Sequence, residues 1–496
     1  MRAGSLLVRI DARSRGNLQG QVYDAIRQAI LDGRLAPGAR LPSTRALAAD
    51  LVVSRTTTLL AYEQLLAEGY LTGVHGSGTF VAAELPDDMP RAATPRQSGR
   101  PRHPPVSRRA ERAAATPVSA IRLPGQSRPF RIGVPALDLF PVRLWSQIAA
   151  RQIRNATMSQ LDYGDAAGWL PLREAIAAHV SAARGTRCTA SQIVIVSGAQ
   201  RGLTLIAQML LDPGDTVWIE EPGYWGARGA LAGAGARLVP VRVDPGGLDV
   251  EAGERAAPDA RLACVTPSHQ FPLAVQMTLT RRLALLDWAR RAPSWIVEDD
   301  YDSEYRYGAR PIPCLHGLDR DGRVIYIGSF SKTLFPSLRL GFLIVPPDLH
   351  ERFRRARRAL DPHPGMLEQA VLATFIADGH YERHLRRMRA ACRERLEALT
   401  AGLKRYCRGA LTLRPLRTGL HAVADLTVAD ASHVFDEAAA RGIEVMPLSA
   451  YYISKQRPEN ALVLGFASNR PDMLVSATAQ LAAAIDAVRR RRPRSA

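Results

Sequence analysis

The chain has 496 residues, 46% hydrophobic and 23% charged, a composition typical of a globular protein of about two to four domains. No apolar run reaches the ~18 residues of a membrane helix, and the N-terminus lacks the apolar core of a signal peptide, so we expect a cytoplasmic protein without a membrane role. The net charge of +19 favours polyanion partners. Its five cysteines are scattered, which argues against a disulfide framework or a metal site.

Composition divides the chain into five parts. We expect an N-terminal arm over residues 1–15, a compact first domain over 16–82 and a large second domain over 121–488. Between the domains, residues 83–120 are rich in proline and arginine and poor in large apolar residues, which predicts an extended linker. The arginine-rich residues 489–496 are expected to form a solvated basic tail.

The first domain shows three helix signals in succession. Apolar residues recur at helical spacing from Leu18 to Ile30, and Gly33 is a suitable helix end. Ser43 and Ser54 are good N-caps for two further helices. The side chains expected to face the core from these two helices are Ala46, Leu47, Leu51, Leu59, Tyr62, Leu65 and Leu66.

Two short strands around a Gly/Ser turn follow the third helix, and this pattern is that of a winged helix-turn-helix. The start of the third helix would then read base edges of double-stranded operator DNA, and the start of the second helix would favour a phosphate. A small helical dimerisation module is the alternative interpretation. The predicted DNA-binding residues are Ser43, Thr44, Arg45, Ser54, Arg55, Thr56, Thr57, His75 and Ser77.

In the second domain, apolar strands alternate with helical patterns, as in an α/β fold. One strand in "VIYIGSFSKTLFPSLRLGFLI" runs into Lys332, where an amine beside hydroxyls and glycine suits a Schiff base. Ser329, Ser331 and Arg339 offer donors to a phosphate. Taken alone, the same residues describe a surface lysine in a serine-rich loop.

Acidic residues end another strand, in "SWIVEDDYDSEYRY". A pyridine ring acting as an electron sink needs a carboxylate at its protonated nitrogen, and Asp299 is the candidate. Tyr301 is placed to hydrogen-bond the phenolic oxygen of such a ring. An acidic loop that binds solvent or a metal is the alternative.

Three further segments complete the predicted pocket. Gly198, Ala199 and Gln200 form a turn between a strand and a helix, which is a phosphate cradle. Tyr224 follows a Pro-Gly turn and could stack on the ring, and His269 and Gln270 at a strand end are predicted ring or O3′ contacts.

Together these motifs identify a family resemblance. The run from "AIRQAILDGRL" to "GSGTFV" resembles the winged helix of the GntR superfamily, and "GVPALDLFP", "TPSHQFP", "EDDYDSEYRY" and "SFSKTLFPSLRLG", in that order, resemble MocR-type regulators. The resemblance implies a winged helix-turn-helix, mostly α with a β wing, joined to an α/β fold-type I aminotransferase-like domain. It also implies a head-to-tail, domain-swapped homodimer that holds pyridoxal 5′-phosphate (PLP) on Lys332 as an internal aldimine.

Two positions depart from the family pattern. Leu273-Ala274 follow "TPSHQFP" where glycine is expected as the second residue. In "NALVLGFASNR", Val463 stands where aminotransferases tend to carry a carboxylate-binding arginine, and Arg470 lies beyond the strand. These departures argue against recognition of an α-amino acid and favour PLP itself as the signal.

The sequence therefore predicts a transcription regulator that senses PLP, or an adduct of PLP with an amine or amino-acid effector, without being a working enzyme. One alternative is an active aminotransferase with an accessory DNA-binding domain. Another is a DNA-binding or scaffolding protein whose PLP fold is inactive.

Overall fold

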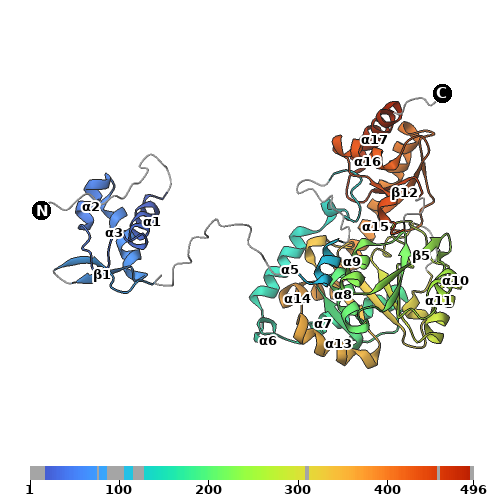
Figure 1. Ribbon diagram of the computed structural model, residues 1–496, viewed down its shortest axis with the longest axis horizontal. Helices are drawn as coiled ribbons and strands as arrows, with labels where there is room; N and C mark the ends of the chain where they lie inside the picture. Colours follow the sequence, from blue (N-terminus) through green and yellow to red (C-terminus); the bar gives the residue numbers. More distant parts are fainter. Residues whose placement is uncertain are drawn as a thin grey trace. The chain divides into compact units, whose positions relative to one another are not determined.

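The computed structural model describes residues 17–74, 77–86, 106–115, 128–307, 312–454 and 459–491. The chain divides into two compact units, Met1–Pro104 and Pro105–Ala496 (Figure 1). Within the described ranges, no helix is both long enough and apolar enough to cross a membrane.

The first unit is a three-helix core with a two-stranded wing. Its elements are α1 Leu18–Leu31, α2 Thr44–Leu51, α3 Arg55–Ala67, β1 Leu71–Val74 and β2 Gly78–Val81. The predicted caps are confirmed, since Ser43 Oγ accepts from the N–H of Ala46 and Ser54 Oγ from that of Thr57, both at 3.1 Å. Antiparallel pairing of β1 with β2 confirms the wing.

The prediction of which residues of α3 face the core was partly wrong. Leu59 and Leu66 are exposed, and Thr58, Ala61, Tyr62 and Leu65 are buried instead. A stripe spaced by three and four residues from Thr58 places Leu59 and Leu66 off its axis. The same correction applies to Ala46, which is exposed on α2 while Leu47 and Ala48 are buried.

The second unit contains a large mixed sheet with strand order β3-β10-β9-β8-β7-β4-β5-β6, in which β9, β8, β7, β4 and β5 are parallel. Strand β10 runs antiparallel to both neighbours. The strands are β3 Ile193–Val196, β4 Thr216–Glu221, β5 Arg237–Asp244, β6 Gly247–Leu248, β7 Leu262–Val265, β8 Trp295–Asp300, β9 Val324–Ser329 and β10 Gly341–Ile344.

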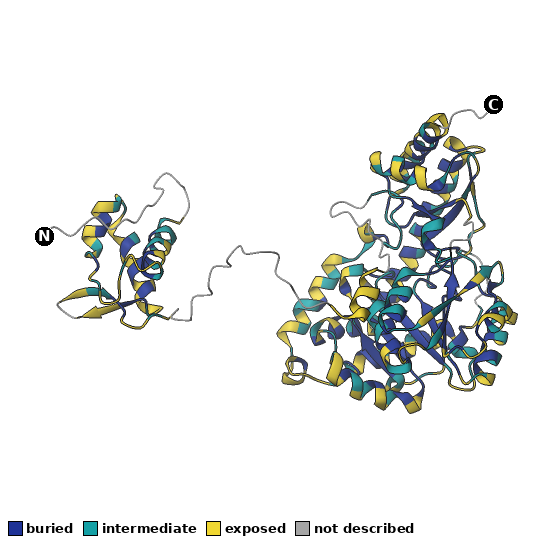
Figure 2. Ribbon diagram, in the orientation of Figure 1, coloured by how far each residue is buried: buried dark blue, intermediate teal, exposed yellow. Residues whose placement is uncertain are grey.

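Helices cover both faces of this sheet, and the burial pattern follows from strand periodicity. Ile193 and Ile195 of β3 join one apolar cluster, and Val194 and Val196 join another on the opposite face. Figure 2 shows the strands buried and the covering helices exposed on their outer sides. These helices are α5 Val142–Arg154, α6 Met158–Leu161, α7 Leu170–Arg184, α8 Ala199–Leu210, α9 Trp225–Gly233, α10 Val250–Ala256, α11 Leu279–Arg291, α12 Leu315–Leu318, α13 Pro347–Leu360 and α14 Met366–Ala377.

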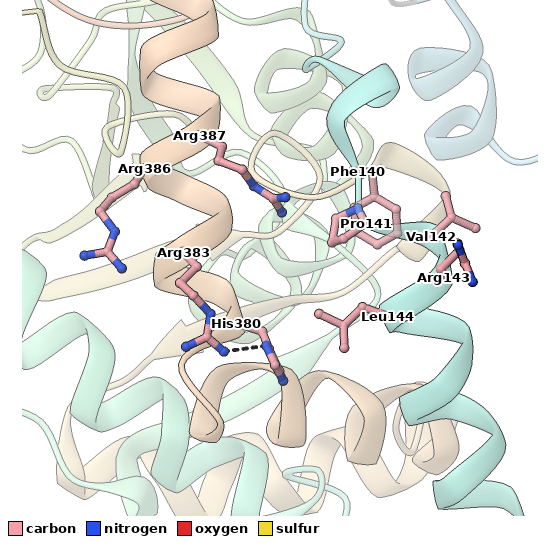
Figure 3. Close-up of a pocket in the computed structure, with 9 residues that line it drawn as sticks. All are labelled: Phe140, Pro141, Val142, Arg143, Leu144, His380, Arg383, Arg386 and Arg387. Atoms are coloured by element: carbon pink, nitrogen blue, oxygen red, sulfur yellow. Dashed lines mark hydrogen bonds between the residues drawn. The ribbon is translucent and has the colours of Figure 1, made fainter.

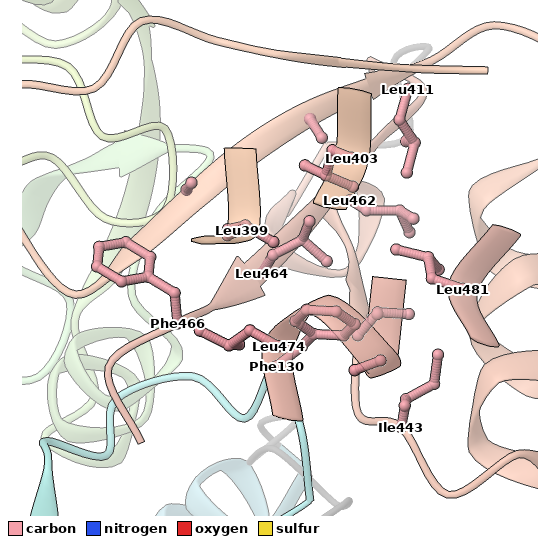
Figure 4. Packing of buried hydrophobic residues seen from close by; sticks show 14 of the residues in the cluster. Phe130, Leu399, Leu403, Leu411, Ile443, Leu462, Leu464, Phe466, Leu474 and Leu481 are labelled. Carbon is pink, nitrogen blue, oxygen red and sulfur yellow. The ribbon is translucent and has the colours of Figure 1, made fainter. Parts of the chain in front are cut away.

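A smaller layer closes the C-terminal part of the unit. A four-stranded antiparallel sheet, ordered β11-β12-β14-β13, packs against helices around a cluster that contains Phe130, Leu462 and Leu464 (Figure 4). Because the backbone of Phe130 accepts a hydrogen bond from Gly465 N–H at 2.8 Å, the segment leading into the domain lies along β14. The elements are α15 His380–Tyr406, β11 Leu411–Leu413, β12 His421–Leu426, α16 Ala431–Ala440, β13 Met446–Pro447, β14 Ala461–Gly465 and α17 Pro471–Arg491.

Two expected irregular segments contain helix. Within residues 83–120, α4 (Arg108–Ala115) forms and packs against α9. Alanine and arginine favour helix, no proline interrupts this stretch, and Ser107 Oγ accepts from Ala110 N–H at 3.2 Å. Of the predicted tail 489–496, Arg489–Arg491 are the last turn of α17, where cations suit the helix dipole.

Candidate functional site

A cavity of about 410 Å³ opens at the carboxyl ends of the parallel strands, beneath the smaller sheet. This edge is where open α/β sheets bind ligands. Of the residues predicted for the cofactor, those that line the cavity are Lys332, Asp299, Tyr301, Tyr224, Ala199, Gln200, Ser329, Ser331 and Arg339. Gly198, His269 and Gln270 are not part of its lining.

Lys332 lies in the turn that follows β9. Its Nζ donates to the carbonyl of Gly133 at 2.7 Å, and its own carbonyl accepts from Tyr305 Oη–H at 2.8 Å. Gly133 has a φ of +77°, and a Cβ there would lie 2.7 Å from Nζ. Because glycine has no Cβ, the amine of Lys332 has room at this position in the cavity.

Side-chain alternation along β8 separates three consecutive acids. Glu298 accepts from the backbone N–H groups of Leu315 and His316, both at 2.9 Å, and Asp300 accepts from Tyr326 Oη–H at 2.5 Å. Asp299 points the other way, into the cavity.

Asp299 is buried, and its Oδ1 has no hydrogen-bond partner in the described part of the chain. Burial, reinforced by the neighbouring Asp300, raises the pKa of Asp299 to about 7. A buried carboxylate oxygen without a donor is costly. The site is therefore suited to a ligand that brings an N–H to this oxygen.

Tyr301 lies in front of a buried imidazole–carboxylate pair. His269 Nδ1 is 2.9 Å from Tyr301 Oη and 3.0 Å from both oxygens of Asp302. An ionised carboxylate only accepts hydrogen bonds, so the two oxygens of Asp302 favour a proton on Nδ1, while His269 Nε2 is buried without a partner in the described residues. Nδ1–H then donates to Asp302 and to the phenolic oxygen, and the proton of Tyr301 is free to point into the cavity.

The ligand atoms of His269, Asp302 and His421 lie within 4.8 Å of one another, a spacing compatible with a metal ion. Both imidazoles already take part in hydrogen bonds. His269 Nδ1 contacts Asp302 at 3.0 Å, and His421 Nε2 contacts the carbonyl of Pro272 at 3.1 Å. A Cβ at Gly419 would also lie 2.6 Å from His269 Nε2. The arrangement fits a hydrogen-bonded network better than a metal centre.

A donor-rich pocket wall forms where α8 begins. Gly198 has a φ of +87°, and a Cβ there would lie 3.6 Å from the guanidinium carbon of Arg339. Ser329 Oγ accepts from Ser331 N–H at 3.2 Å, and the first residues of the 12-residue α8 line the same cavity. A guanidinium, hydroxyls and a helix N-terminus together suit a phosphate.

His269 and Gln270 were expected to touch the ring, and the structure differs on both. Gln270 is turned away because its amide donates to the carbonyl of Pro222 at 2.8 Å and accepts from Leu273 N–H at 2.9 Å. The residue of this segment that lines the cavity is Phe271, edge-on to Tyr224. Sequence spacing cannot show this, because the hydrogen bonds of Gln270 and the contact of His269 with Tyr301 decide which side chain of the turn reaches the cavity.

The far end of the cavity, which the sequence did not reveal, combines an ion pair with apolar walls. Arg131 Nε lies 3.9 Å from Glu444, across 313 residues of chain, and both side chains line the cavity. Apolar lining comes from Ile132, Trp225, Phe271, Leu420, Met446 and Tyr451. Val463 is buried in the apolar cluster beside this end, and Arg470 pairs with Asp472 at 3.0 Å and does not replace an arginine there.

On the first unit, the predicted DNA-binding residues lie at the ends of helices and at the wing. Ser43, Arg45, Ser54, Arg55 and Thr56 are exposed around the starts of α2 and α3. Thr57 is half-buried and shares its hydroxyl with Ser54 at 2.8 Å, and Thr44 accepts from Thr58 through its carbonyl at 2.9 Å. Ser77 is exposed in the wing turn, and His75 lies outside the described residues.

Comparison with known proteins assigns both units. Residues 18–81 match the family of bacterial regulatory proteins called gntR, and residues 132–469 match aminotransferase class I and II. The fold and cavity thus define a regulator class that joins a DNA-binding head to an aminotransferase fold, and this fold implies PLP as a cofactor.

Individual relatives make the family plain. The chain is 42% identical to the probable rhizopine catabolism regulatory protein MocR of Rhizobium meliloti, over 91% of this chain and 90% of that protein. It is 32% identical to the pyridoxine biosynthesis regulator PdxR of Corynebacterium glutamicum, over 94% and 95%. The chain therefore belongs to the MocR-type regulators of the GntR family, which confirms the predicted fold class and resemblance.

Among solved structures, the second unit is similar to α-aminoadipate aminotransferase LysN of Thermus thermophilus, with a TM-score of 0.70 and 27% identity, over 77% of this chain and 97% of that one. That structure contains N-(5′-phosphopyridoxyl)-L-leucine.

Proposed function

We propose that this protein is a transcription regulator that binds operator DNA through its first unit and PLP through Lys332, and whose DNA affinity responds to PLP or to a PLP–amine adduct. The observation that carries the proposal is the cavity itself. The amine of Lys332 and the guanidinium of Arg339 line it from the connection between β9 and β10, and the unpartnered Oδ1 of Asp299 from the end of β8.

The residues fit PLP, which when bound supplies an electrophilic aldehyde and a ring nitrogen that can be protonated. Lys332 would hold the aldehyde carbon, Asp299 would accept the N–H of the ring, and Tyr224 would stack on its face. Arg339, Ser329, Ser331 and the Gly198–Gln200 turn would bind the phosphate. Tyr301 would donate to the phenolic oxygen.

His269 takes a different role from the one the sequence predicted. We assign it, with Asp302, the positioning of Tyr301: the carboxylate holds the imidazole, and the imidazole N–H donates to the phenolic oxygen. The phenol proton then remains available to a ligand. This role follows from the distances around His269 Nδ1.

The walls of the cavity favour sensing over turnover. With Val463 buried where the family's enzymes carry arginine, no guanidinium is offered from β14. An α-carboxylate would have to compete with Glu444 for Arg131. An active aminotransferase is the second candidate, and the similarity to LysN is what favours it.

Two measurements test this proposal. Purified protein incubated with PLP should acquire a visible absorption band, and Lys332→Ala should abolish that band while the far-ultraviolet circular dichroism stays unchanged. With a panel of amino acids, a spectral change confined to one equivalent per site fits a sensor. Sustained turnover near the ~10 s⁻¹ of ordinary enzymes would establish the aminotransferase instead.

A homodimer is part of the proposal, with two heads reading paired half-sites. Large apolar side chains are exposed on and beside α5 and α6, at Ile153, Met158, Leu161 and Tyr163. A single surface with several such residues is typical of a protein interface. Light scattering should therefore give a mass near twice the 54.1 kDa of the chain.

A further inference from the structure

A groove on the second unit gathers arginines outside the PLP cavity (Figure 3). It has a volume of about 820 Å³ and lies between the start of α5 and the first turns of α15. The lining side chains are Phe140, Pro141, Val142, Arg143, Leu144, His380, Arg383, Arg386 and Arg387. We call this set the arginine groove.

The charge in the groove is one-sided. No carboxylate lines it, and among the described residues no ion pair within 4.0 Å involves Arg143, Arg386 or Arg387, whereas His380 Nε2 lies 4.0 Å from the carboxylate of Asp378. Arg383 donates to the carbonyl of Asp378 at 3.1 Å and to His380 at 2.6 Å.

Arg383 has like charges as its neighbours on the surface of α15. It lies three residues before Arg386 and four before Arg387, whereas Arg386 and Arg387 are consecutive and project on different sides of the helix. Like charges at this spacing destabilise a helix, and nearby carboxylates usually relieve the repulsion. Here a bound polyanion would relieve it.

We propose that the arginine groove binds the phosphates of duplex DNA outside the half-sites read by the helix-turn-helix. This inference rests on the proposed DNA-binding function. Guanidinium groups form paired hydrogen bonds with phosphate oxygens, and four of them face one hollow. Arg383 and Arg387 are about 6 Å apart along the helix axis. This distance is close to two phosphate spacings of one DNA strand, each of about 3.4 Å along the duplex axis.

An acidic protein surface is a different partner, and the observations favour DNA. The groove offers donors with no carboxylate acceptor, whereas protein interfaces pair donors with acceptors. The chain also carries a net charge of +19 and a DNA-binding head, so duplex DNA is the polyanion present in its complex.

The test compares two duplexes with the full-length, PLP-loaded protein. The short duplex contains only the operator, selected from random sequences, and the long duplex adds about three helical turns on each side. The variant is Arg386→Glu with Arg387→Glu. A matched control is Arg352→Glu with Arg358→Glu, two exposed arginines of α13.

We expect the groove variant to bind the long duplex at least tenfold more weakly at 0.1 M salt, and the short duplex as tightly as the wild type does. Its salt dependence on the long duplex should fall by about 0.9 in slope for each phosphate that the groove no longer neutralises. Arg386→Gln with Arg387→Gln should give an intermediate loss of affinity, and the control variant should bind less than threefold more weakly.

Equal binding of the long duplex by the wild type and the groove variant would overturn the proposal. So would a changed mass in light scattering with DNA affinity preserved, since the groove would then serve an interface between copies or with an acidic protein. If the wild type bound neither duplex, the proposed DNA-binding function itself would fail, which is a distinguishable result.

Discussion

At the scale of single residues, the cavity contains a carboxylate whose surroundings disfavour its charge. Asp299 shares the interior with Asp300 and Glu220, and burial is the main cause of its raised pKa. Lys332 acts in the opposite direction, as a nearby cation. A ligand that presents a cationic N–H to Asp299 would satisfy both the charge and the unpartnered oxygen.

PLP binding should therefore depend on pH through Asp299. The pKa of Asp299 is about 7 in the folded protein, against an ordinary 3.8, so the folded apo protein keeps a proton on Asp299 that the unfolded chain has released. The stability that this protonated carboxyl contributes to the apo protein is therefore lost as the pH rises through 7. A bound pyridinium would pair with the ionised carboxylate and so prevent this loss of stability. We expect PLP to raise Tm more at pH 8 than at pH 6 in calorimetry. Asp299→Asn should flatten the difference, and a difference unchanged in this variant would contradict the assignment.

The positioning of Tyr301 by His269 and Asp302 predicts a coupled pair of mutations. Asp302→Asn removes the charge and exchanges one of the two acceptor oxygens beside His269 Nδ1 for an NH2 donor. The proton is then held less firmly on Nδ1, so the phenol of Tyr301 can donate to this imidazole nitrogen instead of to a ligand. We expect Asp302→Asn and Tyr301→Phe each to weaken PLP binding about tenfold, the scale of one hydrogen bond. Fluorescence titration of the double variant should show nearly the same loss of affinity, because both substitutions act through one hydrogen bond. Additive losses would show that the two residues act separately.

Local signals allowed part of this site to be predicted. Lys332 and Asp299 each follow a run of buried strand residues, so their place at a sheet edge could be read from the sequence. The Arg131–Glu444 pair could not, because it depends on a segment of chain lying along the smaller sheet. The sequence also could not show that Phe271 lines the cavity in place of His269 and Gln270, because this depends on how the turn folds.

At the scale of elements, α3 is built to present its first turn. Ser54 caps it, Val52 makes the preceding turn in a left-handed conformation with φ of 55°, and the core contacts begin at Thr58. The exposed side chains before Thr58 therefore do not pack against the core and are available for contacts with DNA. This pattern was readable from the caps, whereas the exposure of Leu59 and Leu66 required the helix phase that tertiary packing fixes.

We expect Arg55→Ala to weaken specific operator binding by about 1–3 kcal/mol, the cost of removing one side chain that reads a base edge. Binding to unrelated duplexes should change much less. The comparison variant Arg34→Ala removes an exposed arginine beside Asp32, away from α3. Electrophoretic titration with operator and scrambled duplexes separates the two effects, and an equal loss of affinity on both duplexes would assign Arg55 to phosphate binding only.

The turn after Phe271 predicts a stabilising substitution. Ala274, which stands where the family pattern has glycine, has a φ of +63°, and a Cβ is unfavourable in this region by about 1–2 kcal/mol. Ala274→Gly relieves this strain but adds flexibility to the unfolded chain. We expect a net gain of about 0.5–1 kcal/mol in urea unfolding, with Ala234→Gly, whose parent residue has a helical φ of −76°, destabilising as the control. A loss of stability in Ala274→Gly would show that the turn is not strained.

At the scale of the whole molecule, the two units must communicate for PLP to regulate transcription. A ligand shifts an equilibrium between arrangements only by the difference in its affinity for them. Couplings of about 1–3 kcal/mol are typical, and they correspond to about 5–150-fold in affinity. Composition predicts an extended segment over residues 83–120, whereas the packing of α4 on α9 depends on contacts far apart in the sequence.

The most direct measurement is the affinity for operator DNA of the apo protein and of the PLP-loaded protein, by fluorescence anisotropy at one salt concentration. We expect at least a fivefold difference in Kd, and no response to PLP in Lys332→Ala. Equal affinity of the apo and loaded forms, with PLP bound at Lys332, would contradict it.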